Sequence, residues 1–175
     1  MLRALPITAD AFAPYGWMLG KAFPADPAIP AYTHPTTDFW HEHLFDPGHG
    51  GKAEVLWVNY RNTGPVTQLE VHLRTQQAIV PLTGPVVHIV ARSTPAGMPD
   101  LGTLAAFAVQ PGMGLCMAPG IWHATRVPDA PVTCLMLTRQ STTQDLVAHL
   151  RDGAPAHESA LANIALTNWE IAPHA

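Results

Sequence analysis

Short apolar and β-branched stretches, each followed by turn-forming residues, recur along the middle of this chain. They lie at 53–60, 66–80, 86–91, 104–109, 114–117 and 132–137. The stretch 66–80 is long enough for two strands or for one bent strand. Apolar runs spaced by about ten residues, with Gly and Pro between them, are typical of an antiparallel sandwich or barrel. The pattern therefore predicts an all-β protein.

Only two short segments have the pattern of a helix. The first is 6–12, and the second is 144–150, where apolar residues fall on one side. That apolar side consists of Leu146, Val147 and Leu150. The residues that could cap these helices are Thr8, Asp10, Thr142 and Thr143. We therefore expect few and short helices on a β-rich body.

The remaining segments lie before and after the strands that we expect to form the core barrel. Residues 22–52 hold Pro, Gly, His and Asp with little periodicity, and we interpret them as a long loop or a weakly paired arm. Residues 17–19 look like the start of a strand. Beyond Gly153 the character is mixed, and the apolar residues near 169–171 can fold back on the body. We expect one domain over 1–175, with a core barrel over roughly 53–140.

Composition and charge narrow the class of protein. Of the 175 residues, 47% are hydrophobic and 13% are charged, and the net charge is −4, so neither disorder nor a nucleic-acid partner is indicated. The apolar runs are too short to span a membrane, and the first residues lack the apolar segment of a signal peptide. Cys116 and Cys134 lie in apolar stretches, as buried thiols in a reducing compartment would. We expect a soluble, cytoplasmic protein.

One polar pair interrupts the predicted strand over residues 66–80. Glu70 and His72 are two residues apart, so on a strand they project from the same face. Burying both would be unfavourable unless they are paired or bind a ligand. The alternative is an ordinary solvated face of an antiparallel sheet.

The wider spacing favours a ligand site. Glu70-x-His72, four residues, Gln77, six residues and Gly84 resemble the first sequence motif of cupin domains. Such a resemblance implies a double-stranded β-helix, or jelly roll, built as an antiparallel β-barrel.

The second cupin motif follows later in the chain. Gly114, the Pro119-Gly120 turn and His123 resemble it, with a contraction of one residue. The turn is expected to direct His123 from a neighbouring strand into the mouth of the barrel. The two motifs come in the order that the cupin fold requires.

The four side chains offer the ligand types of a transition-metal site. Imidazole nitrogens with carboxylate and amide oxygens suit a divalent ion such as Ni, Fe, Mn or Zn, with positions open for a substrate. The predicted ligands are Glu70, His72, Gln77 and His123. The alternative is a metal-free pocket that uses the same side chains for hydrogen bonding and acid–base chemistry. No organic cofactor is indicated.

The chain as a whole resembles the ureidoglycolate lyase family, also called ureidoglycolate hydrolase, within the cupin superfamily. The resemblance rests on segments in the same order and at nearly equal spacing. These are Leu5-Pro6 to Tyr15-Gly16, Leu69 to Pro81, Pro99 to Phe107 and Gly114 to His123.

The resemblance implies an enzyme that cleaves ureidoglycolate to glyoxylate and urea in purine and allantoin breakdown, typically as a homodimer. Glu70, His72 and His123 are the implied catalytic residues, with Glu70 or His123 as the base and possible assistance by a metal. The implied partners are a small-molecule substrate and a second subunit. We expect an arginine to bind the substrate carboxylate, because a guanidinium group can donate two parallel hydrogen bonds to the two carboxylate oxygens. The candidates are Arg74, Arg126 and Arg139.

The chain also departs from the family pattern near these residues. Val71 and Leu73 stand where the family has Arg and Pro, and Ala124 and Thr125 stand where it has His and Pro. Late in the chain, Thr138 precedes Arg139 where the family tends to have Asp. These departures affect the expected substrate more than the expected fold.

Two other functions are compatible with the same four side chains. One is a metal-dependent cupin of another class, a dioxygenase or an isomerase, acting on a related small acid. The other is a non-catalytic cupin that binds a small molecule. Among the other histidines, His41 and His43 have a ligand-like spacing but lie in the expected arm, as a pocket lid or an exposed loop. His88 is interpreted as a buried barrel residue rather than a ligand.

Overall fold

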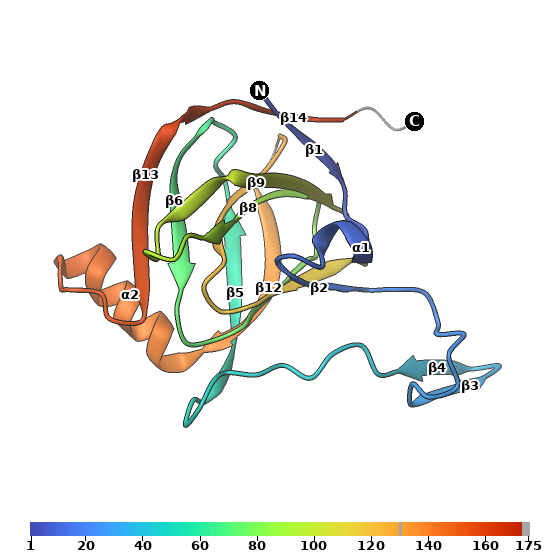
Figure 1. Ribbon diagram of the computed structural model, residues 1–175. Coiled ribbons are helices and arrows are strands. Elements are labelled where there is room, and N and C mark those ends of the chain that lie inside the picture. The colour runs from blue at the N-terminus through green and yellow to red at the C-terminus, as the bar shows by residue number, and fades with distance from the viewer. Residues whose placement is uncertain (130, 173–175) are drawn as a thin grey trace.

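The structure is a computed structural model that describes residues 1–129 and 131–172. Strands dominate it, and the two helices are short (Figure 1). The first strands and helix are β1 Leu2–Pro6, α1 Ala9–Phe12, β2 Gly16–Leu19, β3 Ala31–His34, β4 Thr37–Trp40, β5 Ala53–Tyr60 and β6 Val66–His72. The others are β7 Gln77–Pro81, β8 Val86–Ser93, β9 Pro99–Val109, β10 Gly114–Met117, β11 Trp122–Arg126, β12 Val132–Arg139, α2 Gln140–Asp152, β13 Ser159–Thr167 and β14 Trp169–Ile171.

Two packed sheets form the barrel. The larger sheet has seven strands in the order β13-β6-β11-β8-β9-β1-β14, and the smaller has five in the order β2-β10-β7-β12-β5. All pairings are antiparallel except those of β1, which runs parallel to both β9 and β14. This arrangement confirms the predicted all-β, cupin-type barrel. No helix among the described residues is long and apolar enough to cross a membrane.

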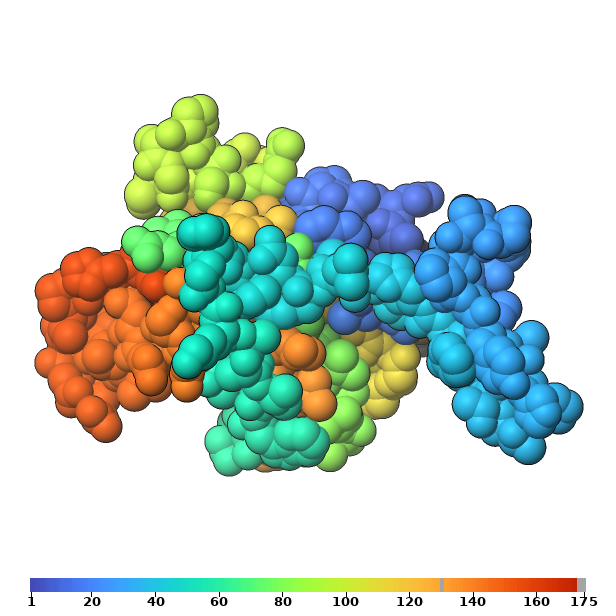
Figure 2. Space-filling view, turned by 90° about the horizontal axis from the view of Figure 1, so that it is seen from below, coloured from blue at the N-terminus to red at the C-terminus, as the bar shows by residue number. Residues whose placement is uncertain are grey.

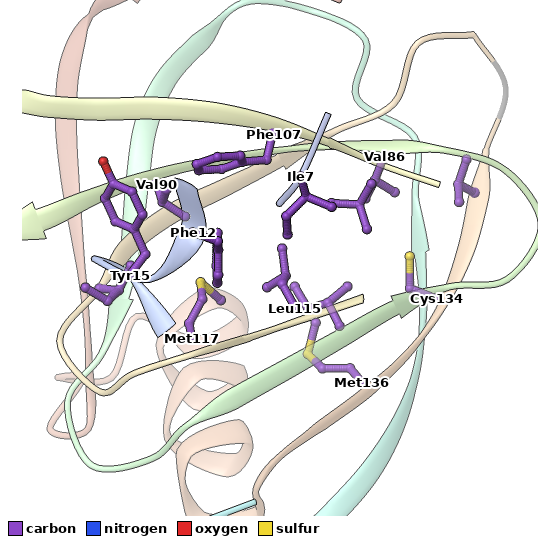
Figure 3. Close-up of a cluster of buried hydrophobic side chains, with 14 of the residues drawn as sticks. Ile7, Phe12, Tyr15, Val86, Val90, Phe107, Leu115, Met117, Cys134 and Met136 are labelled. Atoms are coloured by element: carbon purple, nitrogen blue, oxygen red, sulfur yellow. The ribbon is translucent and has the colours of Figure 1, made fainter. Parts of the chain in front are cut away.

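Strand alternation divides the apolar side chains of the large sheet between two cores. On β8, Val86 and Val90 point between the two sheets, whereas Val87 and Ile89 point to the opposite face. The core between the sheets contains Phe12, Tyr15, Phe107, Leu115, Met117 and Met136 (Figure 3). Cys116 and Cys134 are both free and buried, as predicted.

The second core is enclosed by the end of the chain. β13 pairs with β6 at one edge of the large sheet, and β14 pairs with β1 at the other edge. Figure 1 shows this last segment arching over the top of the molecule. Beneath it lie buried side chains that include Leu69, Val71, Ile89 and Trp122. The fold-back expected near Trp169 is therefore confirmed, and it closes the large sheet on itself.

The helices match the sequence prediction in part. Thr8 caps α1 by accepting a hydrogen bond from the Ala11 N–H at 3.3 Å. The second helix is longer than the predicted 144–150, because it begins directly where β12 ends. Thr142 and Thr143 therefore lie inside the helix, and their predicted capping role is wrong. The N-cap is Arg139, whose side chain makes no capping hydrogen bond.

The hydrophobic pattern did not predict strands β1, β11, β13 and β14. Each draws its stability from neighbours distant in sequence, as β13 does from its pairing with β6. The segment 22–52 contains one hairpin, β3–β4, which projects from the body on the side away from α2 and β13 (Figure 2). Residues 22–52, interpreted from the sequence as a long loop or a weakly paired arm, contain no other strand or helix among the described residues.

Candidate functional site

Strand pairing brings the candidate residues together at one end of the barrel. Glu70 and His72 lie on β6, and His123 on β11 is the direct cross-strand partner of Glu70. Gln77 is the first residue of β7 and comes from the other sheet. The four side chains predicted from the two motifs therefore meet where the sheets converge.

The side-chain atoms of this cluster converge on a small volume. Nε2 of His72 lies 2.9 Å from Oε1 of Glu70 and 2.8 Å from Nε2 of Gln77. One ligand atom from each of Glu70, His72 and His123 lies within 4.8 Å of the others. The rings of His72 and His123 are 5.2 Å apart between centroids.

Hydrogen bonds on the far side of each ring fix how the histidines face the cluster. Nδ1 of His123 donates to the Ile121 carbonyl at 3.1 Å, because a carbonyl can only accept. Its Nε2 is therefore left as an acceptor or ligand atom. Nδ1 of His72 lies 3.0 Å from Oγ of Ser159, the cross-strand neighbour of His72 on β13. Such outer hydrogen bonds are typical of metal-ligating histidines.

A glycine turn holds His123 in place. Gly120 has φ +82°, a left-handed conformation that other residues adopt only with strain. Its N–H donates to the His72 carbonyl at 2.8 Å, and its carbonyl accepts from the Ser93 hydroxyl at 2.7 Å. The Pro119-Gly120 turn is thus tied by a hydrogen bond to the strand of His72 directly before His123.

The surroundings set the charge states of the cluster. Burial alone would raise the pKa of Glu70, but the hydrogen bond with His72 and the charges of His123 and His72 together lower it. Burial and the nearby His72 lower the pKa of His123 to about 4, against smaller raising effects of Glu70 and the Ile121 carbonyl. Near neutral pH, Glu70 is therefore ionised and His123 is neutral.

A second layer of side chains lies behind His123. His88 is fully buried and stacks on His123, with ring centroids 5.7 Å apart. Its Nδ1 lies 3.0 Å from Thr125 Oγ1, and its Nε2 lies 3.1 Å from the Met117 sulfur. His88 is thus a buried barrel residue with both nitrogens occupied, as expected. Burial also raises the pKa of the neighbouring Tyr60 far above its ordinary value, so its phenol stays protonated.

The cluster forms the floor of a cavity of about 260 Å³. Strands β5 and β12 supply one wall and helix α2 supplies another. Besides the four floor residues, the lining consists of Leu56, Val58, Tyr60, Ala124, Thr125, Met136, Thr138, Thr142, Thr143, Leu146, Val147 and Leu150. Its volume lies just below the usual range for drug-sized ligands, so the cavity suits a small molecule.

None of the three candidate arginines lines this cavity. Arg126 donates to the backbone carbonyls of Gly64, Pro65 and Thr125. Arg74 and Arg139 both form ion pairs with Glu158, at 3.5 and 3.4 Å. Their assignment to substrate binding remains a prediction, and the contacts seen here do not support it.

The departures from the family pattern fall on different faces of their strands. Val71 is buried in the second core, because it alternates with Glu70 and His72 and points away from the cavity. Ala124 lines the cavity. Ala124 also packs against the second core, because it alternates with His123, so neither of these two departures changes a side chain on the face of Glu70 and His123. Thr125, by contrast, lines the cavity on that face.

The other histidine pair lies outside the cavity. Nε2 of His43 is 2.9 Å from Oε1 of Gln76, and the ring of His43 stacks on Trp17 with centroids 4.4 Å apart. His41 is exposed. Neither residue lines the cavity, so the alternative of a pocket lid at these positions gains no support.

Ser159 and Tyr60 carried no functional signal in the sequence, and Thr138 stood out there only as a departure from the family pattern. Ser159 lies in the tail and reaches His72 only through the pairing of β13 with β6. Tyr60 and Trp57 lie on opposite faces of β5, and Tyr60 is the one that lines the cavity. Thr138 Oγ1 is buried and has no hydrogen-bond partner among the described residues. Only the tertiary structure places Tyr60 and Thr138 in the cavity lining and Ser159 behind His72.

The residues present fit a divalent metal. His72 Nε2 cannot at once donate to the carboxylate of Glu70 and accept from the amide N–H of Gln77. Oε1 of Gln77 is buried without a hydrogen-bond partner among the described residues. Turning this amide by 180° would direct its oxygen toward His72, since the oxygen and nitrogen positions are interchangeable in shape. Two oxygens and an imidazole nitrogen would then face one point, which is the donor set of a cation site.

The fold and the site together define a cupin-type barrel with a buried cluster of histidine and carboxylate side chains at the floor of its cavity. The sequence profile of the ureidoglycolate lyase family matches residues 1–155. The chain therefore belongs to the ureidoglycolate lyase family, and the resemblance found in its motifs is confirmed. No curated protein matches the sequence.

Solved structures with a similar fold share little sequence with this chain. RmlC from Streptococcus suis, solved in complex with dTDP-D-xylose, is 13% identical, with a TM-score of 0.45 over 64% of this chain and 61% of that chain. The chain thus spans less than two thirds of that protein. The dTDP sugar isomerase from Desulfovibrio desulfuricans G20 is 15% identical, with a TM-score of 0.45 over 77% of this chain and 80% of that chain. The RmlC epimerase of Mycobacterium tuberculosis is 11% identical, with a TM-score of 0.46 over 71% and 62%.

Proposed function

We propose that this protein is a lyase that cleaves a small carbinolamide hydroxy acid, with ureidoglycolate as the substrate that the family name indicates. The products would be glyoxylate and urea. The observation that carries this proposal is the pairing of an ionised carboxylate with two imidazoles at the floor of a small cavity, in a chain of this family.

The reaction needs one proton acceptor and one proton donor. When the substrate hydroxyl loses its proton, its oxygen forms the C=O bond of glyoxylate and the C–N bond breaks. The leaving nitrogen gains a proton and departs as urea, so the proton passes from oxygen to nitrogen without any other reactant.

Glu70 is the best placed base. Its side chain is 27% exposed, whereas that of His72 is 5% exposed, so a substrate in the cavity meets the Glu70 carboxylate first. The lowered pKa of Glu70 keeps it ionised at neutral pH. The same group can return the proton to the leaving nitrogen, and neutral His123 lies beside it as the cross-strand partner. His72 contacts both Glu70 and Gln77, and these contacts fix the position of the Glu70 carboxylate at the floor of the cavity.

A divalent metal would be held by Glu70, His72 and His123, with Gln77 as a fourth ligand. When bound, it would stabilise negative charge on the substrate oxygens, which lowers the barrier to losing the hydroxyl proton. The hydrogen bonds from His123 to Ile121 and between His72 and Ser159 would keep both rings facing the metal position.

The test is a glyoxylate-release assay on purified protein whose metal content has been measured. We expect ureidoglycolate or a close analogue to release glyoxylate and the amide product in equal amounts. Protein stripped with a chelator should lose activity and regain it with one of Ni, Fe, Mn or Zn. Binding of the substrate without any turnover, in metal-loaded protein, would instead indicate a non-catalytic binding cupin.

A second candidate function rests on the composition of the cluster. Two histidines and one carboxylate are also the donor set of non-haem iron oxygenases. This alternative predicts that the iron-loaded protein consumes oxygen in the presence of a small organic acid. Oxygen uptake without glyoxylate release would favour the oxygenase over the lyase.

We also propose that the protein is a homodimer whose partner is a small-molecule substrate. We propose further that it works in the cytoplasm, in the breakdown of purines. The exposed aromatic arm supports a subunit contact: Tyr32 and Phe39 stack on each other across the β3–β4 hairpin, 5.2 Å apart between centroids. Light scattering should give twice the mass of the chain. The double change Tyr32→Ser and Phe39→Ser should lower that mass, whereas Leu166→Gln on β13 should not.

A further inference from the structure

The apolar face of α2 lines the cavity instead of a hydrophobic core. Thr143, Leu146, Val147 and Leu150 fall at the i, i+3, i+4 and i+7 positions that share one side of a helix. In most proteins such a stripe packs on the core. Here all four residues line the cavity, and neither core cluster among the described residues includes the three aliphatic ones.

Polar contacts, rather than apolar packing, hold this helix in place. Thr142 donates to the carboxylate of Glu158 at 2.6 Å, and Ser141 donates to the same carboxylate at 3.0 Å. Asp145 accepts from the N–H groups of His157 and Glu158, both at 2.9 Å. Thr142 is the only buried residue of the helix. The apolar stripe is therefore not needed to anchor α2 and remains available to a ligand.

The wall opposite α2 is also apolar. Leu56 and Val58 on β5 and Met136 on β12 face the cavity above the polar floor. The lining contains no Lys or Arg among the described residues, since the nearby arginines are engaged with Glu158 and with backbone carbonyls. The cavity thus joins a polar, catalytic floor to aliphatic walls.

Free urea fits such walls poorly. It carries several N–H groups, and burying them without hydrogen bonds is unfavourable. Of the hydroxyls around the cavity, those of Thr142 and Thr125 are already paired with Glu158 and His88. Two buried oxygens of the lining, Thr138 Oγ1 and Gln77 Oε1, have no partner among the described residues, and the hydroxyl of Thr138 can donate to one amide carbonyl. One amide followed by an aliphatic chain matches these walls.

We propose that the substrate of this enzyme is a carbinolamide hydroxy acid whose leaving group is an N-acyl amide with a short aliphatic chain, rather than free urea. This inference rests on the proposed lyase function for the reaction itself. The hydroxy acid end lies at the floor of Glu70, His72 and His123, and the aliphatic chain lies between α2 and the strands β5 and β12. The products are then glyoxylate and an aliphatic amide.

A binding series tests the apolar wall without any turnover. Glycolate, 2-hydroxybutanoate and 2-hydroxyhexanoate share one head group and differ only in chain length. We expect the dissociation constant, measured by calorimetry, to fall about fourfold for each methylene that the walls bury. A dissociation constant that stays level or rises along the series would overturn the proposal.

Two equally exposed leucines provide a matched pair of variants. Leu150 is 64% exposed and lines the cavity, and Leu166 is 63% exposed and does not. Leu150→Gln should weaken 2-hydroxyhexanoate binding about fivefold while leaving glycolate binding unchanged. Leu166→Gln should change neither. If Leu150→Gln changes the oligomeric state but not the chain-length dependence, the stripe is a subunit contact and the proposal is wrong.

An activity comparison separates this inference from the proposed function. Ureidoglycolate and N-hexanoyl-2-hydroxyglycine both yield glyoxylate, so one assay serves both. We expect a higher kcat/KM for the hexanoyl compound. A higher value for ureidoglycolate would leave the lyase function standing and overturn the substrate class. Turnover of neither compound, with the chain-length dependence of binding intact, would overturn the lyase function and leave the apolar ligand class standing.

Discussion

At the scale of single residues, the same side-chain type takes different roles because its surroundings differ. His123 and His88 stack on each other, yet His123 presents Nε2 to the cavity, whereas both nitrogens of His88 are occupied within the core. Arg126 shows the same principle for a charged residue. Its guanidinium donates hydrogen bonds to backbone carbonyls and does not line the ligand cavity.

The first prediction at this scale concerns the floor of the cavity. Glu70→Gln removes the ionised carboxylate and His123→Ala removes the neighbouring imidazole, so each should lower kcat by at least about a hundredfold. Circular dichroism and the melting temperature should stay close to those of the unchanged protein. Near-normal turnover in both variants would show that the site has been placed wrongly.

The second prediction separates Arg126 from the cavity. Arg126→Met should reduce the free energy of unfolding by about 2 to 4 kcal/mol, because three carbonyls lose a charged hydrogen-bond donor. The KM of the folded fraction should not change. Urea unfolding and steady-state kinetics on the same preparation measure the two effects. A large rise in KM with an unchanged free energy of unfolding would show that Arg126 binds the substrate.

At the scale of secondary-structure elements, α2 is the feature that gives the cavity its character. Its sequence shows an ordinary amphipathic stripe, which on its own predicts packing against a core. Hydrogen bonds at Glu158 and Asp145 hold the helix without packing of this stripe against a core, and the stripe forms a wall of the cavity. Of the two threonines predicted as caps, Thr142 instead pairs with Glu158 from inside the helix.

The prediction for this element depends on pH. Burial alone would raise the pKa of Asp145, but hydrogen bonds from the N–H groups of Glu158 and His157 lower it in the folded protein. The stability that Asp145 contributes is therefore fully present above its unfolded pKa, about 3.9, and is lost as the pH falls through the folded value. Asp145→Ala should cost about 1 kcal/mol at pH 7, since the group is exposed to solvent screening.

Urea unfolding at pH 7 and at pH 3 measures this effect. The difference in unfolding free energy between the variant and the unchanged protein should shrink at the lower pH. Gln144→Ala on the same helix, whose side chain makes no such contact among the described residues, serves as the control. An equal difference at both pH values would contradict the proposed role of the ionised carboxylate.

At the scale of the whole molecule, the last strands join the two edges of the large sheet. β13 and β14 follow each other in sequence, yet they pair with opposite edges, so they enclose the second core and also place Ser159 beside His72. Stability and the floor of the cavity are thus linked through one segment of chain. Trp169 fastens this segment by donating to the Gly64 carbonyl at 2.9 Å.

The prediction at this scale is that Trp169→Ala loosens the closure. Loss of a partly buried indole and its hydrogen bond should lower the free energy of unfolding by about 2 kcal/mol, which corresponds to a fall in Tm of about 4 to 8 °C. Differential scanning calorimetry measures this shift. Trp57→Ala, at an exposed position on β5, is the control and should leave Tm nearly unchanged. Equal effects of the two changes would refute a closing role for Trp169.

The sequence by itself determined the fold class and the floor of the cavity. Strand alternation put Glu70 and His72 on one face, and motif spacing placed Gln77 and His123 beside them. The same alternation already directed Val71 away from the cavity, so its departure from the family pattern could have been recognised as a change in the core. The faces of Glu70, Val71 and His72 follow from local backbone geometry, whereas the places of Gln77 and His123 were implied by the resemblance to the cupin motifs.

The tertiary structure alone decided what surrounds that floor. The pairing of β13 with β6, the engagement of Arg74 and Arg139 by Glu158, and the turning of the α2 stripe toward the cavity all join residues far apart in the chain. Such contacts depend on which surfaces the folded chain brings together, and no local periodicity encodes them. For that reason the candidate site residues could be predicted from the sequence, whereas the apolar walls around them are seen only in the folded chain.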